Sequence, residues 1–254
     1  MSILEVNGLK KVYSTRLGGN KVEALKNVNF SVSEGEYVAI MGESGSGKTT
    51  LLNILAALDR PTSGSVMIDG RDLSKIKDSA VCAFRRDNLG FVFQDFNLLD
   101  TFTVEDNIYL PLVLAGKSYD EMHSRLEPIA KRLGITELLK KYPYEISGGQ
   151  KQRPAVARAL KTEPRMILAD EPPGALDSKS TDELLRLFTE VNALGQTILM
   201  VTHSVKAASS AKRVLFIKDG EVFHQIYRGA DTDSQLYQKI SETLTLLATG
   251  GERK

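Results

Sequence analysis

The sequence predicts an α/β fold with a parallel core sheet, and three observations support this prediction. Apolar, strand-like runs at residues 37–41, 166–169 and 197–202 are separated by segments with helical periodicity. The first of these runs leads through a glycine-rich turn directly into a helix, which is the order of a strand-helix unit. With 254 residues and 42% hydrophobic content, the chain can bury one large core and carry a subdomain.

The first part of the chain predicts strands that pair as hairpins. Apolar and polar residues alternate from residue 3, at 24–30 and at 38–41, and turn residues at 18–20 and 34–35 separate these strands. A buried helix over 48–58 follows, because leucine and isoleucine side chains recur there with helical spacing. Residues 66–68 then predict a short strand that ends at an Asp-Gly turn.

Residues 95–160 predict a more variable, helical segment, which is a candidate inserted subdomain. Met122, Leu126, Ile129 and Leu133 would share one helix face. We expect Pro128 to kink or split this helix, because proline removes a backbone hydrogen bond.

The last part of the chain predicts a hairpin around 218–220 and then a helix with Leu236, Ile240, Leu244 and Leu247 on one face. The end of the tail, 250–254, is expected to fray. We therefore expect one domain over residues 1–228, with a helical subdomain at about 95–160, and a C-terminal helical extension over 229–254.

Composition excludes several classes of protein. The chain has 33 basic and 32 acidic residues, so it lacks the positive charge of a nucleic-acid binder. Its one cysteine, Cys82, cannot form an internal disulfide and suits a reducing cytosol, where an unpaired cysteine is usually a small buried side chain. The N-terminus lacks the pattern of a signal peptide, and no apolar run approaches the roughly 18 residues of a membrane span.

The most informative stretch is the glycine-rich turn at residues 42–49, Gly-Glu-Ser-Gly-Ser-Gly-Lys-Thr. Its glycines allow consecutive backbone amides to point at one centre, where they can surround a polyphosphate at the positive end of the following helix. Lys48 would add a charge for the β- and γ-phosphates, and the Thr49 hydroxyl would ligate Mg²⁺. The pattern is far more specific than an ordinary glycine-rich turn.

Polar residues at strand ends form a second candidate element. The strand at 166–169 is followed by Asp170, which could hold Mg²⁺ or its water shell, and Glu171, which could orient an attacking water. Taken alone, this pair could equally be a solvated turn. His203 follows the next strand and could contact the γ-phosphate, although a lone histidine there is more often structural. Gln94 could reach the metal or the water.

The third element is the string Ser147-Gly148-Gly149-Gln150. Ser147 is a suitable helix N-cap, and the two glycines after it expose backbone amides at the positive end of a helix. Such a surface would attract an anion, although the same residues could simply be a capped helix start.

The order of these motifs resembles that of ATP-binding cassette (ABC) ATPases, and the resemblance covers essentially residues 3–227. Within that superfamily the chain is most similar to the nucleotide-binding subunits of macrolide-export and lipoprotein-release transporters. Segments 93–100, 147–153 and 174–180 are most similar to bacitracin-type antimicrobial-peptide resistance systems. The resemblance implies a P-loop NTPase core with a parallel sheet, an N-terminal antiparallel β subdomain and an inserted helical subdomain.

The resemblance also implies roles for individual residues. Tyr13 would stack on adenine, although an aromatic in an early strand is more often part of the core. Mg²⁺ would be organised by Thr49, Gln94 and Asp170, Glu171 would be the general base, and His203 would sense the γ-phosphate. The other residues expected to contact ATP are Gly42, Ser44, Gly45, Ser46, Gly47, Lys48, Thr50, Ser147, Gly148, Gly149, Gln150 and Asp177.

The string at 147–150 would act on the nucleotide of a second copy, so that a homodimer sandwiches two ATP molecules. The dimer would power a separate multi-spanning permease from the cytoplasmic face of the bacterial membrane, for export or detoxification of antimicrobial peptides. A sensor kinase could be reached through that permease. Residues 95–112 would meet the permease, although their apolar side chains fit ordinary packing equally well.

Two other interpretations remain open. The chain could be a regulatory module that signals through a membrane partner without moving a substrate. It could also be a soluble ABC protein of DNA or ribosomes, although a single compact cassette of balanced charge does not favour this.

Two prolines depart from the family pattern. Pro154 would lie inside the helix that Ser147 caps, at a cost of roughly 3 kcal/mol unless that helix bends. We therefore expect Pro154→Val to raise both thermal stability and ATP turnover. Pro173 lies in a loop, where we expect little effect beyond a stiffer approach to Asp177.

Overall fold

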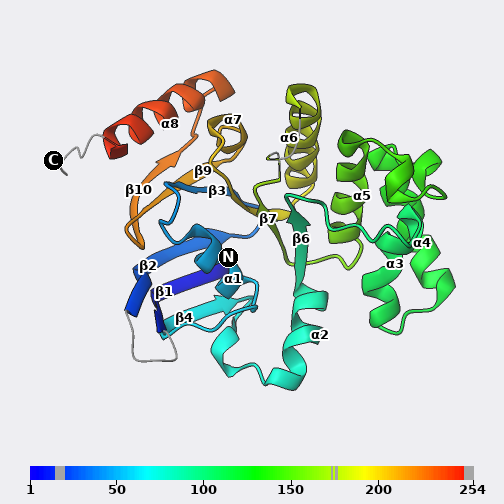
Figure 1. Ribbon diagram of the computed structural model, residues 1–254, viewed down its shortest axis with the longest axis horizontal. Coiled ribbons are helices and arrows are strands. Elements are labelled where there is room, and N and C mark those ends of the chain that lie inside the picture. The colour runs from blue at the N-terminus through cyan, green and yellow to red at the C-terminus, as the bar shows by residue number, and fades with distance from the viewer. Residues whose placement is uncertain (15–20, 173, 175–176, 249–254) are drawn as a thin grey trace. The chain divides into compact units, whose positions relative to one another are not determined.

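The computed structural model describes residues 1–14, 21–172, 174 and 177–248, and the chain divides into two compact units. The first unit comprises Met1–Ile76 and Thr197–Lys254, and the second comprises Lys77–Gln196. Figure 1 labels the elements of both. The predicted turn at 18–20, Pro173, the Ala175-Leu176 pair and the predicted frayed tail at 250–254 lie outside the described residues.

An antiparallel sheet forms one layer of the first unit, with the strand order β2-β1-β4-β5. Strand β1 pairs with both β2 and β4, and the hairpin expected from the alternating pattern is confirmed. Leu4 and Val6 of β1 are fully buried, because alternate side chains of a strand point to the same face. Leu9 is also fully buried, after a register shift between Val6 and Leu9. The four strands are β1 (Ser2–Ser14), β2 (Lys21–Ser33), β4 (Ser63–Ile68) and β5 (Arg71–Asp72).

The first unit also holds a mainly parallel set of strands in the order β10-β9-β3-β8. The central strand β3 (Tyr37–Gly42) runs parallel to β8 (Thr197–Val201) and to β9 (Arg213–Lys218). It is buried along its length, which explains its continuous apolar run. The predicted hairpin is confirmed, because β10 (Glu221–Tyr227) pairs antiparallel with β9.

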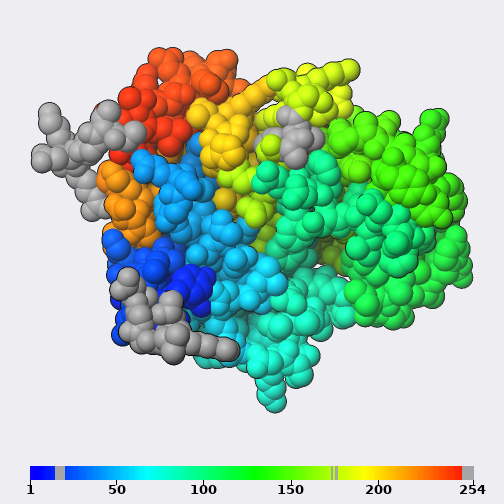
Figure 2. All heavy atoms as spheres, viewed as in Figure 1, coloured from blue at the N-terminus to red at the C-terminus, as the bar shows by residue number. Residues whose placement is uncertain are grey.

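Three α-helices lie in the described part of the first unit. The predicted buried helix is α1 (Lys48–Leu55). The predicted C-terminal helix is α8 (Asp233–Ala248), which packs on the short α7 (Val205–Ala208), as the orange-red and gold atoms in Figure 2 show. Leu236 and Ile240 of α8 are buried. Among the described residues, no helix is both long enough and apolar enough to cross a membrane.

The second unit combines two parallel strands with five helices among its described residues. Strand β6 (Leu89–Phe93) pairs in parallel with β7 (Met166–Asp170). Helices α3 and α4 pack against α5, so the predicted helical segment is present (Figure 1). The helices are α2 (Asp78–Asn88), α3 (Val104–Leu114), α4 (Tyr119–Leu133), α5 (Gly148–Leu160) and α6 (Ser178–Ala193), with 3₁₀ turns at Leu73–Lys75 in the first unit and at Thr136–Leu138 and Pro143–Glu145 in the second.

Three local features differ from the sequence-based expectations. Pro128 does not split its helix, because α4 runs unbroken between a Ser118 cap and the left-handed Gly134, whose φ is 62°. Cys82 is exposed on α2 instead of buried, because α2 is a charged helix that buries little. The sequence-based expectations also did not include α2 or β6.

Candidate nucleotide-binding site

The glycine-rich turn is a compact loop between β3 and α1. Strand β3 ends at Gly42, and Gly47 caps α1 with a φ of 102°, a left-handed conformation that favours glycine. A β-carbon on Gly47 would lie 2.5 Å from the carbonyl oxygen of Ala24, and one on Gly42 would lie 2.7 Å from the Ser46 hydroxyl oxygen. Gly45 faces open space. The loop is therefore closely packed on its inner side and open on its outer side.

The polar groups of this loop fit a polyphosphate. The Ser46 hydroxyl is buried without a hydrogen-bond partner among the described residues. The Lys48 ammonium donates to the carbonyl oxygens of Gly42 and Glu43, each at 2.8 Å, so it lies against the loop. The first amides of α1 have no partner within the helix and carry its positive dipole end. An anion would therefore meet a hydroxyl, a cation and amide donors at one place.

His203 lies near the same strand ends as this loop. Strands β3 and β8 are parallel with Ile40 opposite Val201, and the Thr202 amide donates to the Ile40 carbonyl oxygen at 3.0 Å. His203 is the next residue and is exposed. The Thr202 hydroxyl accepts from the Ser204 amide at 3.0 Å, which fixes the turn that carries the imidazole.

Tyr13 lies near the end of β1 and is 42% exposed, so it is not a core aromatic. Its hydroxyl donates to Asp59 at 2.8 Å. Burial and then the hydrogen bond to Asp59 raise the pKa of Tyr13 above its ordinary value, so the phenol stays protonated. The ring is therefore a partly open aromatic surface held in place at its hydroxyl end.

In the second unit, the structure brings together the predicted polar residues of β6 and β7. Phe93 is opposite Asp170 in the parallel pair, so Gln94 and Glu171 follow neighbouring strand ends. A β-carbon on Gly174 would lie 2.9 Å from Gln94 Nε2, and the Gly174 amide donates to the Glu171 carbonyl oxygen at 2.8 Å. Glu171 has a φ of 45°, which is rare outside glycine and is found most often at functional sites.

The charge of this pair favours a cation. Burial first, and the negative charge of Glu171 second, raise the pKa of Asp170. A divalent ion would offset both effects, and carboxylate, amide and hydroxyl oxygens are the ligands that Mg²⁺ prefers. In the described part of the chain, no group of three His, Cys, Asp or Glu side chains could hold a metal alone. The oxygen atoms of Asp170 and Gln94 fit a Mg²⁺ ion that also binds phosphate oxygens.

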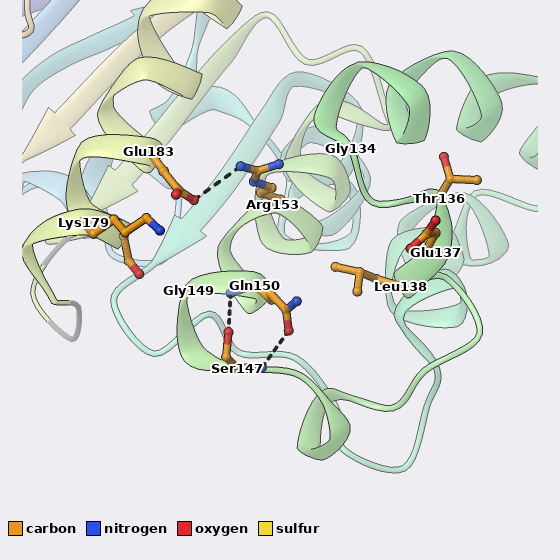
Figure 3. Close-up of a pocket in the computed structure, with 11 residues that line it drawn as sticks. Gly134, Thr136, Glu137, Leu138, Ser147, Gly149, Gln150, Arg153, Lys179 and Glu183 are labelled. Carbon is orange, nitrogen blue, oxygen red and sulfur yellow. Dashed lines mark hydrogen bonds and ion pairs between the residues drawn. The ribbon is translucent and has the colours of Figure 1, made fainter.

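The Ser147 string forms a capped helix start. The Ser147 hydroxyl accepts from the Gln150 amide at 3.2 Å, and the Gln150 side-chain oxygen accepts from the Ser147 amide at 3.0 Å (Figure 3). Gly148 is exposed, whereas Gly149 lies so close to the Ser180 hydroxyl that a β-carbon would not fit. Asp177 caps α6 by accepting from the Ser180 amide at 2.9 Å. The starts of α5 and α6 are thus packed together.

A hollow of about 620 Å³ lies beside this helix start and is lined by the segment that follows α4 (Gly134 and the 3₁₀ turn Thr136–Leu138), by the start of α5 and by α6. Arg153 crosses it, because its guanidinium donates to the Leu133 carbonyl oxygen at 3.2 Å and pairs with Glu183 at 3.3 Å (Figure 3). Arg153 therefore ties the end of α4 and the side of α6 to α5.

Sequence reasoning missed several of these contacts. The Arg158 guanidinium, near the end of α5, donates to the carbonyl oxygens of Phe96 at 2.7 Å and of Asn97, two residues with left-handed backbones shortly after Gln94. Lys11 and Asp59 contact Tyr13. The two-residue spacing of Lys11 and Tyr13, which places both on one strand face, was the only sequence signal for this group.

A phosphate loop between a parallel strand and a helix, with carboxylates at the ends of parallel strands, defines a P-loop NTPase. The family model described as ABC transporter matches residues 25–174. The chain belongs to the ABC transporter family and is one of its ATP-binding ATPase subunits.

Relatives and solved structures agree with this assignment. The chain is 48% identical to the ABC transporter ATP-binding protein YxdL of Bacillus subtilis over 97% of this chain and 95% of that protein. It is 46% identical to the bacitracin export ATP-binding protein BceA of Halalkalibacterium halodurans over 97% of each chain. The dimeric, post-hydrolysis structure of the cassette MJ0796 with ADP and Pi matches with a TM-score of 0.78 and 40% identity, over 88% of this chain and 98% of that one. The predicted fold class is confirmed.

Proposed function

We propose that two copies of this chain close around two MgATP molecules and power a separate multi-spanning permease that exports or detoxifies antimicrobial peptides. The observation that carries this proposal is the exposed, capped start of α5. Its backbone amides, the open Gly148 and the Ser147 hydroxyl form an anion-attracting surface on the second unit, whereas the phosphate loop belongs to the first unit. The start of α5 in a second copy would contact the nucleotide that is held by the phosphate loop of the first copy.

The chemistry would be divided among the described residues. Ser44 to Thr50 would cradle the triphosphate, and Gln94 and Asp170 would complete the oxygen shell around the Mg²⁺ on Thr49. Glu171 would take the proton of the attacking water, and His203 would contact the γ-phosphate. Ser147 to Gln150 and Asp177 would act across the dimer. Because ATP would favour the closed pair and hydrolysis would release it, the reaction would drive a mechanical stroke.

The relatives support the proposed export function and the proposed dimer. The protein BceA is a bacitracin export ATP-binding protein, and MJ0796 forms a dimer with ADP and Pi. We place the chain at the cytoplasmic face of the bacterial membrane, with residues 95–112 against the permease. Leu99 and Phe102 in that segment are 44% and 40% exposed, which leaves apolar surface for a partner helix.

In the alternative of a regulatory module, the same dimer would hydrolyse ATP and signal through the membrane partner without moving a substrate. A sensor kinase that reads the transporter would be reached through the permease. Peptide flux into inverted membrane vesicles distinguishes the two functions, because a signalling module would hydrolyse ATP without accumulating peptide. Copurification with a multi-spanning protein argues against a role on DNA or ribosomes.

The test of the mechanism is the variant Glu171→Gln. We expect it to bind MgATP and to form a stable dimer by light scattering, while phosphate release falls by about 10²- to 10⁴-fold, the contribution of a general base. Glu190→Gln, on the exposed face of α6, is the matched control and should hydrolyse normally. Near-normal turnover in Glu171→Gln would remove this residue from the base role, and a persistent monomer with MgATP would contradict the sandwich.

A further inference from the structure

Tyr13 is surrounded by three polar side chains of the first unit, which we call the Tyr13 clamp: Lys11, Thr50 and Asp59. The Tyr13 hydroxyl donates to Asp59 Oδ2 at 2.8 Å. The Thr50 side chain lies close to the same phenol. The Lys11 ammonium lies over the ring, 4.8 Å from its centre. Both the edge and one face of the phenol are therefore held.

Lys11 is itself fixed by groups other than the ring. Its ammonium donates to Asp59 Oδ1 at 2.6 Å and to the Arg60 carbonyl oxygen at 2.7 Å. Only 13% of its side chain is exposed. Because the cation covers one face of the ring and Tyr13 is 42% exposed, the opposite face is the one left for a stacking partner.

Asp59 is the centre of the clamp. Burial alone would raise its pKa, but hydrogen bonds from Lys11, Tyr13 and the Arg60 amide hold the pKa of this carboxyl below its ordinary value. At neutral pH it is an anion that accepts from both Lys11 and the phenol. The ring orientation is thus set by charge-assisted hydrogen bonds, which are stronger than neutral ones.

We propose that Lys11 and Asp59 are positioning residues for nucleotide binding: they hold Tyr13 as a preformed platform for the base. The inference rests on the proposed stacking role of Tyr13. Thr50 belongs to α1, which begins at the phosphate loop, so the platform lies close to the first turn of that helix. A side chain already ordered in the free protein loses less entropy when the base stacks on it.

A purely structural role is the competing explanation, because the Lys11–Asp59 pair also joins β1 to the turn that follows α1. The chain offers a matched control for it. Lys10, the adjacent residue, pairs with Glu23 at 2.5 Å, and both side chains are about 40% exposed. No described contact joins Lys10 to Tyr13. Lys10→Met therefore removes a β1 ion pair without disturbing the platform.

The experiment compares two ligands, MgATP and inorganic tripolyphosphate, which lacks the base. Their dissociation constants are measured by calorimetry for Lys11→Met, Asp59→Asn, Tyr13→Phe and Lys10→Met. We expect the first three variants to bind MgATP about three- to tenfold more weakly and tripolyphosphate normally, because only base stacking is impaired. In steady-state hydrolysis KM should rise by the same factor, with kcat within about twofold of wild type.

The outcomes separate this inference from the proposed role of Tyr13. If Tyr13→Ala binds MgATP normally, the platform itself is wrong. If Tyr13→Ala weakens MgATP but Lys11→Met and Asp59→Asn behave like Lys10→Met, the platform stands and the positioning role is wrong. An equal loss for both ligands would show a structural role and would also overturn the inference. If Asp59→Asn fails to fold, Tyr13→Phe and Lys11→Met decide the result.

Discussion

Pro154 gives a prediction whose size can be worked out from the structure. The residue lies inside α5 and is buried, and the helix continues through it to Leu160. Proline has no amide hydrogen, so the carbonyl of Gln150 one turn earlier lacks its helical partner. Gln150 is also half of the capping box with Ser147, so this missing bond lies next to the proposed ATP-contacting residues.

The substitution Pro154→Val would restore that hydrogen bond. An interior proline destabilises a helix by about 3 kcal/mol. The low helix propensity of valine reduces the stabilisation from its removal by roughly 0.5 kcal/mol. Valine is similar in volume, so we expect no large cavity beside the buried Ala155 and Val156. The net gain is about 2 kcal/mol, which for a chain of this size corresponds to roughly 4–8 °C in Tm.

Thermal unfolding and hydrogen exchange of the α5 amides measure this gain, and phosphate release measures turnover. We expect turnover to rise as well, because the Ser147 end of α5 would be better ordered. Pro128→Val is the matched control: Pro128 is also inside a helix, but on the exposed face of α4, so it should raise Tm without changing turnover. Unchanged Tm and turnover in Pro154→Val would show that the fold already accommodates the ring.

Two further predictions concern the second unit. Gly149→Ala should lower Tm and the urea midpoint, because the added β-carbon would overlap the Ser180 hydroxyl. Gly148→Ala should leave both values unchanged, because its β-carbon would meet no atom within 4 Å. Equal midpoints for the two variants would contradict this packing. Lys161 is fully buried, its ammonium donates to the Met122 carbonyl oxygen at 2.7 Å, and burial lowers its pKa to about 8. In the unfolded chain, the Lys161 ammonium keeps its proton up to the ordinary pKa of 10.5. Between about pH 8 and pH 10.5 the unfolded chain therefore binds more protons than the folded chain. The free energy of unfolding of the wild type should then rise with pH from about 8 to 10.5. Urea titrations at each pH measure the free energy of unfolding, and Lys161→Met should lack this rise. Parallel pH profiles of the free energy of unfolding for the wild type and the variant would refute the role of Lys161.

Sequence reasoning worked best where local backbone chemistry decides the structure. The phosphate loop, the Ser147 cap and the paired strand ends near Asp170 depend on residues close together in the chain or on strand order, and the structure has all three. It failed for α2, a charged helix that buries only Phe84 and Asn88, and for β6, a five-residue apolar strand that is too short to give a clear pattern. The clamp around Tyr13 was also missed, because Asp59 is distant in sequence and only tertiary pairing brings it to the ring.

The hydrogen bonds from Arg158 to the backbone of Phe96 and Asn97 have a mechanical consequence. Helix α5 has 13 residues, so it is a rod of about 20 Å. One end of the rod is fastened by two hydrogen bonds to the loop at Phe96 and Asn97, and the other end carries the Ser147 cap. A membrane protein that presses on this loop would therefore tilt the helix as a lever, and the displacement would appear at the Ser147 tip, which we propose contacts the nucleotide of the second copy.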